Sequence, residues 1–300
     1  MHARRWFSRL SRPVLSRLVL RGLIVPALVA AGALAAAAQD TPPDDRPFHL
    51  DLDTGGHRAF IKDITFSPDG EYLLTASDDK TIRIWDWRSG VTVRTLRGFV
   101  GDDNDGKVFA LAISPDGKTV AAGGYFGPGI GQSPPYGNIR LFDFGTGRML
   151  DVLKAPQLTV YDVQFSPDGS LLAAAGQDGL AYLWQRDGDG WKEAGTLDAE
   201  SNRIEKIAFV LGGKRLAAVT TDYGIRLWDV ASGQRIDMAD AQPLDDISVT
   251  ALAATPDGAR FATGTVGGVI QVWDAASGSL TQTLPSLGFQ IGALTFAGPD

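Results

Sequence analysis

Short runs of alternating apolar and polar residues follow one another along most of the chain, and turns of a fixed composition separate them. In residues 57–86, two such runs are joined by Ser67-Pro68-Asp69-Gly70, and a third ends at Trp85-Asp86. Pro presets φ at the first corner of a tight turn, Asp bonds back to the backbone, and Gly accepts positive φ. The pattern therefore predicts antiparallel strands at about 60–66, 72–77, 81–85 and 91–96.

The turn and the strand end recur at a regular distance. Turns of the same kind occur at 114–117, 166–169 and 255–258, a degraded copy occurs at 211–213, and a further one begins at Gly298. The strand ends Trp85, Phe142, Trp184, Trp228 and Trp273 lie 57, 42, 44 and 45 residues apart. A period of about 40–45 residues with several short strands indicates propeller blades. We predict an all-β propeller with blades at 57–97, 98–155, 156–199, 200–241 and 245–286, and a partial blade at 289–300.

These motifs resemble the WD-repeat (WD40-type) family over residues 46–300. The first blade carries most of the family pattern, with Gly56-His57, Thr81-Ile82-Arg83-Ile84-Trp85-Asp86 and Ser89-Gly90. The resemblance implies a structural hydrogen-bond network in each blade that joins His, Ser or Thr, Asp and Trp. Its expected members are His57, Ser77, Asp79 and Trp85 in blade one, Asp178 and Trp184 in blade three, Thr220, Asp222 and Trp228 in blade four, and Trp273 in blade five.

The two ends of the repeat region suggest how the ring closes. Residues 48–53, near Arg46, resemble an outer strand without a blade of its own, and the family implies that such a strand completes the last blade. Gln290–Phe296 begins a sixth copy, and the sequence stops inside its turn. An open ring exposes a sheet edge. We therefore expect the sequence to be a C-terminally incomplete piece that lacks roughly 30 to 80 residues.

The N-terminal segment has a different composition. Residues 1–21 contain six Arg and no acid, residues 22–38 are apolar and Ala-rich, and four Ala (Ala35–Ala38) precede Gln39. This order predicts a signal peptide at 1–38 and a linker at 39–47. Arg4-Arg5 resembles the twin-arginine export motif, and ordinary arginines of a basic region are the alternative. We expect a periplasmic or secreted bacterial protein. An uncleaved membrane anchor and a mitochondrial transit peptide remain as alternatives.

Composition argues against several kinds of chemistry. The sequence has no Cys, and beyond the signal only His49 and His57 remain, neither within a catalytic or metal motif. From residue 22 onward 22 basic side chains face 35 acidic ones, a net charge of −13, which disfavours nucleic-acid binding. The acidic run Asp102-Asp103-Asn104-Asp105 lacks the spacing of a calcium loop. We expect no catalytic residue, no metal and no cofactor.

Two insertions in blade two, at 98–106 and 123–138, break the repeat. The family places both loops on one face, and long loops on a rigid scaffold often carry function. Tyr125, Phe126 and Tyr136 are aromatic anchor candidates, although a Gly/Pro-rich spacer is the alternative. Six further candidates precede the first strand of each blade, at the channel mouth that the family implies. They are Phe60, Lys107, Thr159, Arg203, Ser248 and Gln290.

The sequence therefore favours an exported WD-repeat propeller that binds a protein or peptide partner and has no catalysis of its own. One alternative is a regulatory propeller within a larger polypeptide, whose caspase-like peptidase or kinase domain would lie beyond Asp300. The other is an enzymatic propeller of the lactonase or quinoprotein kind, which the repeat motif and the scarcity of His and Cys disfavour.

Overall fold

The computed structural model describes residues 55–98, 104–126, 138–155, 159–222, 224–238 and 249–297. They belong to one compact unit that begins at Thr54. The signal peptide, the linker and the closing strand expected at 1–53 lie outside the described residues. In the described part, no helix is long and apolar enough to pass through a membrane.

The fold consists of five antiparallel sheets, each built from strands that are consecutive in sequence. Sheet one contains β1 (Ile61–Phe66), β2 (Tyr72–Ser77), β3 (Thr81–Asp86) and β4 (Val91–Arg97). Sheet two contains β5 (Val108–Ile113), β6 (Thr119–Gly124), β7 (Ile139–Asp143) and β8 (Met149–Leu153). Sheet three contains β9 (Val160–Phe165), β10 (Leu171–Gly176), β11 (Leu180–Asp187) and β12 (Gly190–Asp198).

The last two sheets differ in the number of their strands. Sheet four has three, β13 (Ile204–Val210), β14 (Arg215–Thr220) and β15 (Ile225–Asp229), with a 3-10 turn at Leu211–Gly213 between the first two. Sheet five contains β16 (Val249–Ala254), β17 (Arg260–Thr265), β18 (Ile270–Asp274) and β19 (Leu280–Leu284). The predicted all-β propeller is confirmed, and the strands expected in the first repeat agree with the observed ones within one residue.

The Ser-Pro-Asp-Gly turns adopt the geometry that their composition predicts. In the first, Gly70 has a φ of 69° and donates its N–H to the carbonyl of Ser67 at 2.8 Å. The Ser67 hydroxyl donates to Asp69 Oδ1 at 2.5 Å, and this carboxylate also accepts the N–H of Glu71 at 3.0 Å. Each turn therefore closes a tight hairpin and fixes the register of its two strands.

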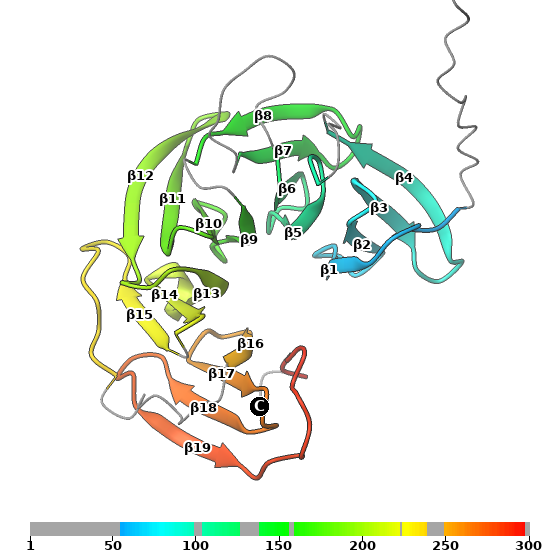
Figure 1. Ribbon diagram of the computed structural model, residues 1–300. Coiled ribbons are helices and arrows are strands. Elements are labelled where there is room, and N and C mark those ends of the chain that lie inside the picture. Colours follow the sequence, from blue (N-terminus) through cyan, green and yellow to red (C-terminus); the bar gives the residue numbers. More distant parts are fainter. Residues whose placement is uncertain are drawn as a thin grey trace, which may run out of the picture. The chain divides into compact units, whose positions relative to one another are not determined.

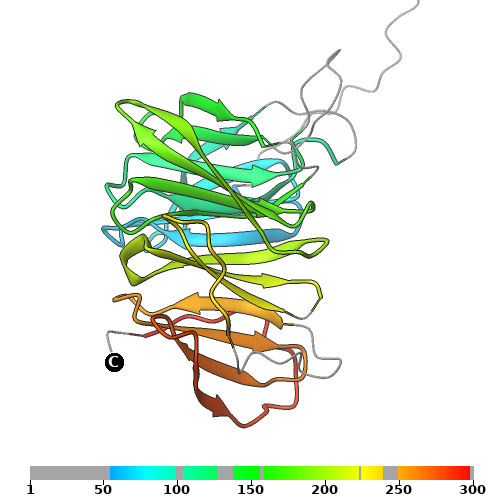
Figure 2. The same cartoon turned by 90° about the vertical axis from the view of Figure 1, so that its left-hand side faces the viewer.

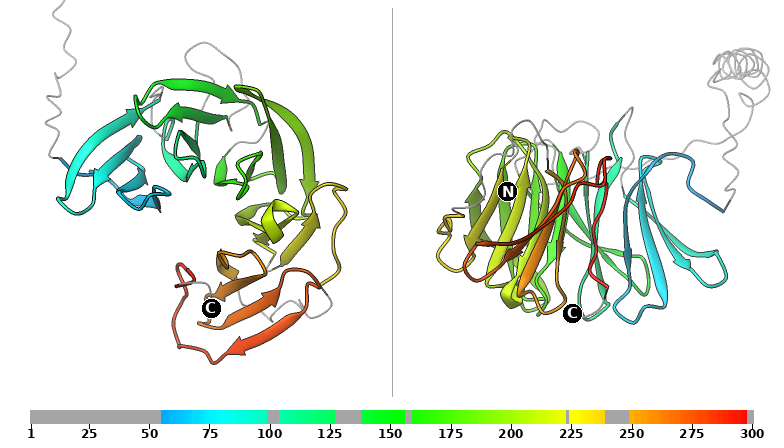
Figure 3. Two further views of the ribbon diagram at one scale, coloured as in Figure 1. Left: turned by 180° about the vertical axis from the view of Figure 1, so that it is seen from behind. Right: turned by 90° about the horizontal axis from the view of Figure 1, so that it is seen from below.

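The five sheets follow one another as the blades of a propeller (Figure 1). The first strand of each blade, β1, β5, β9, β13 or β16, is innermost, and inner strands of consecutive blades contact one another. The turned views show the sheets stacked face to face (Figures 2 and 3). The same end of every blade therefore carries its leading loop, before the first strand, and the turn between its second and third strands. We refer to this side as the upper face.

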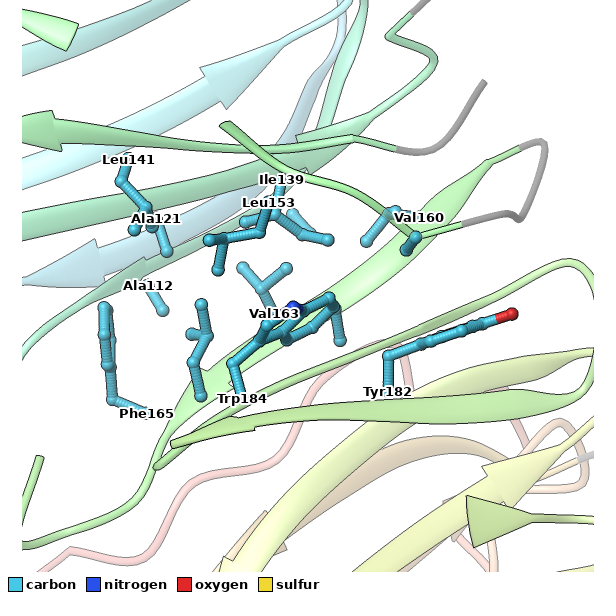
Figure 4. Close-up of a cluster of buried hydrophobic side chains, with 14 residues drawn as sticks. Ala112, Ala121, Ile139, Leu141, Leu153, Val160, Val163, Phe165, Tyr182 and Trp184 are labelled. Carbon is cyan, nitrogen blue, oxygen red and sulfur yellow. The ribbon is translucent and has the colours of Figure 1, made fainter. Parts of the chain in front are cut away.

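The hydrophobic core lies between consecutive blades. At the junction of blades two and three, Leu141 and Ile139 of β7 face Val163 of β9 and Trp184 of β11 (Figure 4). Trp184, Trp228 and Trp273 are at most 2% exposed, because the preceding blade covers each of them. Trp85 of blade one is only half-buried, since no blade precedes it among the described residues.

Two segments differ from the expected repeat. After β15, the described residues of blade four form only an isolated bridge between Trp228 and Arg235. Met238 then packs against Gly278 of blade five. The expected sixth copy at 290–296 forms no strand in the described residues. Instead, Ile291 donates its N–H to Thr265 at 3.0 Å and accepts the Thr250 hydroxyl at 2.7 Å, so this segment lies against blade five.

Candidate functional site

The hydrogen-bond network of blade one forms around a residue that the sequence did not single out. His57 Nδ1 lies 2.8 Å from Asp79 Oδ2, and His57 Nε2 lies 2.6 Å from the hydroxyl of Thr75. Trp85 donates its indole N–H to the same hydroxyl at 2.8 Å. His57, Asp79 and Trp85 thus occupy their expected places, and Thr75 replaces Ser77 as the hydroxyl that joins them.

Strand register explains this correction. Leu73 pairs with Trp85, so Thr75, two residues further on, lies on the same side of the sheet as the indole. Ser77 sits at the end of β2, where it caps the turn by accepting the N–H of Asp79 at 3.1 Å. The sequence did contain a signal for Thr75, since blade five repeats the ten-residue spacing with Thr263 and Trp273, which are hydrogen-bonded at 3.0 Å.

In blades three and four, alanine takes the place of this threonine. The register puts Ala174 and Ala218 where blade one has Thr75. Asp178 accepts the hydroxyl of Tyr182 at 2.7 Å; burial, together with this carboxylate, raises the pKa of Tyr182. Asp222 accepts the hydroxyl of Thr220 and a 2.8 Å bond from Arg226. These aspartates therefore bind strand residues, and Trp184 and Trp228 are held by packing.

The residues predicted to surround the channel mouth occupy equivalent backbone positions. The carbonyls of Phe60, Lys107, Thr159 and Arg203 each accept an N–H from the turn after the second strand of their own blade, at 3.0 to 3.1 Å. Their side chains differ, because Phe60 is 79% exposed and Thr159 is buried. Lys107 and Arg203 are half-buried, and Gln290 is exposed. Ser248 lies outside the described residues.

The two insertions of blade two meet where they join the sheet. Gly106 donates its N–H to the carbonyl of Tyr125 at 2.8 Å, and Tyr125 donates to Lys107 at 3.0 Å. Tyr125 is half-buried at the base of its loop. Tyr136 and most of both loops, at 99–103 and 127–137, lie outside the described residues.

Phe126 is not a surface anchor, contrary to the sequence-based prediction. Its side chain is 2% exposed and belongs to the core between blades one and two. The guanidinium carbon of Arg140 lies 4.2 Å from the centre of its ring. Phe126 follows β6 at the base of the insertion, so it contributes to the packing of the blade.

Aromatic and cationic side chains form a continuous row along the start of four inner strands, which we name the aromatic ladder. Lys62 Nζ lies 5.8 Å from the ring centres of both Phe60 and Phe109. Phe109 stacks on Tyr161 with centres 6.2 Å apart and an interplanar angle of 7°, and the guanidinium of Arg203 lies 5.0 Å from Tyr161. The ladder links blades one to four. Three of its members, Lys62, Phe109 and Tyr161, were missed because they follow the predicted positions by two residues.

The charges of the ladder are largely balanced within the protein. Lys62 pairs with Asp78 at 3.4 Å, and Arg203 forms an ion pair with Glu205. Such contacts hold the ladder in a preformed shape, with Phe60 as its most exposed apolar member. Among the described residues, no group of three or more His, Cys, Asp or Glu side chains is arranged to hold a metal ion.

Comparison with known proteins identifies the repeat. The family described as "WD domain, G-beta repeat" matches residues 51–86, 90–128, 147–185 and 244–274. Blade four lies between the last two matches and contains the degraded turn at 211–213.

Three relatives illustrate the similarity. Periodic tryptophan protein 2 of Arabidopsis thaliana is 29% identical over 59% of this chain and 18% of its own length. Eukaryotic translation initiation factor 3 subunit I of Emericella nidulans is 25% identical over 69% of this chain and 60% of its own length. An uncharacterized WD repeat-containing protein of Synechocystis is 29% identical over 59% of this chain and 45% of its own length. The chain thus spans less than two thirds of each relative.

Proposed function

The chain belongs to the WD-repeat family, and from that premise we propose that it is a non-catalytic scaffold that binds a protein or peptide partner at its upper face. WD-repeat proteins generally act as scaffolds for protein interactions. The observation that carries the proposal is the aromatic ladder, which ends on Phe60, a side chain that is 79% exposed among the described residues. An exposed aromatic side chain on a preformed surface is the kind of anchor that dominates binding energy at protein interfaces.

The aromatic ladder supports a partner-binding site on the upper face rather than on the outer strands. Lys62, Phe109, Tyr161 and Arg203 come from four different blades, so a partner seated on them contacts the whole rigid scaffold. Tyr125 and Lys107 bring the base of both insertions to the same face. Rigid aromatic rings lose little conformational entropy on binding, which supports affinity without new ordering of the protein.

The test uses a photo-crosslinking amino acid at Phe60 and, as a matched control, at Met149 on the outer strand β8, which is 49% exposed. We expect crosslinking to one partner from Phe60 only. The partner is then purified, and its affinity for Phe60→Ala should fall by about 2 kcal/mol or more, as at an interface hot spot. Met149→Ala should bind as the unmodified protein does. Equal affinity of both variants would contradict the proposed site.

Export is the second part of this proposal. Its support is the order of basic residues, apolar residues and small residues before Gln39. Mass spectrometry of the protein recovered from its source should give a mature N-terminus at Gln39, in a periplasmic or extracellular fraction. An intact N-terminus in the membrane fraction would instead indicate an anchor.

A second candidate is a regulatory propeller within a larger polypeptide. It is favoured by the relatives, because the chain aligns with as little as 18% of one of them. Immunoblotting of the native protein separates the two candidates. A band near the 31.9 kDa of this chain, or larger only by the one or two blades that the repeat predicts, favours the simple scaffold, and a band tens of kilodaltons larger favours the regulatory propeller.

A further inference from the structure

Three charged residues occupy the same position in the inner strands of different blades. Asp63 of β1 pairs with Ala76, Asp162 of β9 pairs with Ala175, and Lys206 of β13 pairs with Val219, each just after a bulge or irregularity in its strand. The equivalent residues of blades two and five are Ala110 and Ala251. Blades one, three and four thus carry a charged side chain at an inner-strand position where the other two blades carry alanine.

Both carboxylates bind the next blade. Asp63 Oδ2 accepts the N–H of Leu111 in blade two at 2.8 Å, and Asp162 Oδ2 accepts the N–H of Ile207 in blade four at 2.8 Å. A hydrogen bond to an ionised acceptor is about twice as strong as a neutral one. Each bond therefore ties two neighbouring blades, and its strength depends on the charge of its carboxylate.

Lys206 connects the two carboxylates. The charge of Asp162 raises the pKa of Lys206 against the effect of burial, and the charges of Asp63 and Glu205 raise it further. Asp162 is only 2% exposed, and Asp63 is half-buried. The other elements packed on Asp63 contribute the backbone of Leu111 from β5 and the carboxylate of Asp162 from β9. Two carboxylates therefore share one ammonium in a setting where unbalanced charge is costly.

We propose that Asp63, Asp162 and Lys206 form a proton-sensitive connection that couples the junction of blades one and two to the junction of blades three and four. When Asp63 takes up a proton, the hydrogen bond from the Leu111 N–H to its carboxyl group is no longer charge-assisted. The ammonium of Lys206 then interacts with the negative charge of Asp162 and no longer with one on Asp63. The bond from Ile207 to Asp162 then changes as well, because the charge of Lys206 acts on both carboxylates.

The electrostatic surroundings of Asp63 place this event in mild acid. Burial raises the pKa of Asp63 to about 6; Lys206 and the Leu111 amide lower it, and Asp162 raises it. Burial also raises the pKa of Asp162, against the opposing charge of Lys206. Because the pKa of Asp63 is higher in the folded chain than the ordinary 3.8, its contribution to stability is full below pH 3.8 and is lost as the pH rises through 6.

The test follows the backbone amide signals of Leu111 and Ile207 by NMR between pH 5 and 8 in the full chain. An amide bound to a titrating carboxylate reports that titration. We expect the Leu111 signal to move with a midpoint near pH 6 and the Ile207 signal to move with the same midpoint. The measurement needs no partner, so its outcome is independent of the proposed scaffold function.

Three variants separate coupling from simple proximity. Asp63→Asn keeps an acceptor for Leu111 and should abolish the shared midpoint at both amides. Lys206→Met should raise the Leu111 midpoint and separate it from the midpoint of Ile207, with Lys206→Gln as the substitute if that variant does not fold. Circular dichroism checks folding. An Ile207 response that persists in Asp63→Asn, or a Leu111 signal that does not move in the unmodified protein, would overturn the proposal.

Discussion

Thr75 Oγ1 lies 2.8 Å from the indole nitrogen of Trp85 and 2.6 Å from Nε2 of His57, so one hydroxyl joins the second strand, the third strand and the leading loop of blade one. The carboxylate of Asp79 only accepts, so His57 Nδ1 carries a proton. The Thr75 hydroxyl can then accept from Trp85 while it donates to Nε2. This relationship accounts for the anchoring of the leading loop on blade one.

Replacing Thr75 by Val should therefore destabilise the protein more than removing the hydroxyl that the sequence had favoured. Thr75→Val leaves two partly buried partners unsatisfied, which costs about 1–3 kcal/mol. Ser77→Ala loses a turn bond of 3.1 Å and a longer one of 3.4 Å, and should cost about 1 kcal/mol or less. Urea unfolding of both variants measures the difference, and an equal loss would contradict the role of Thr75.

Substitution of Gly179 by Ala should destabilise the fold more than the same substitution at other glycines with positive φ. Its φ is 76°, and a Cβ there would lie 1.8 Å from the carbonyl oxygen of Ser201. Gly188, with a φ of 58° and open space around it, is the matched control. Gly188→Ala should cost about 1–2 kcal/mol from the backbone conformation alone. Gly179→Ala should lower the midpoint of thermal unfolding clearly further, because the backbone of blade three must move.

Phe126 should behave as a core residue. Truncation to Ala removes a ring that is 2% exposed and leaves a cavity beside Arg140, at a cost of about 3–5 kcal/mol. Tyr125→Ala, at the half-buried neighbouring residue, should lower the free energy of unfolding by less than Phe126→Ala does. Chemical denaturation distinguishes the two, and a Phe126→Ala variant as stable as the parent would mean that the ring is exposed in solution.

The turn aspartates should make the fold sensitive to strong acid. Hydrogen bonds from Ser67, Ser166 and Thr255 hold the pKa values of Asp69, Asp168 and Asp257 below the usual 3.8. A lowered pKa stabilises the fold above 3.8, and this contribution is lost as the pH falls through the lowered values. The melting temperature of the unmodified protein should fall when the pH is lowered below about 4. Asp168→Asn should have a lower melting temperature than the unmodified protein at about pH 5, and a smaller decrease between that pH and strong acid. A pH profile unchanged in the variant would contradict this.

The sequence predicted the blades well because their signals are local. A turn such as Ser67–Gly70 and the alternation along Ile64 and Phe66 act within a few residues, so strand positions follow directly. The choice between Thr75 and Ser77 depended on register across two strands. The burial of Phe126, and the meeting of Asp63 with Lys206, depended on how different blades face one another. Those contacts arise from packing between repeats, which no single repeat specifies.

The half-buried indole of Trp85 also marks an uncovered face of sheet one among the described residues. A stack of repeats gains its stability from each sheet and from the contacts between neighbouring sheets. Sheets two to four are packed on both faces, whereas the face of sheet one that carries Ile64 and Phe66 is open, each of these side chains being more than half exposed. Where no further segment covers that face, amide protons of β1 to β4 should exchange with solvent before those of β9 to β11. The best-preserved repeat in the sequence thus has an exposed sheet face among the described residues.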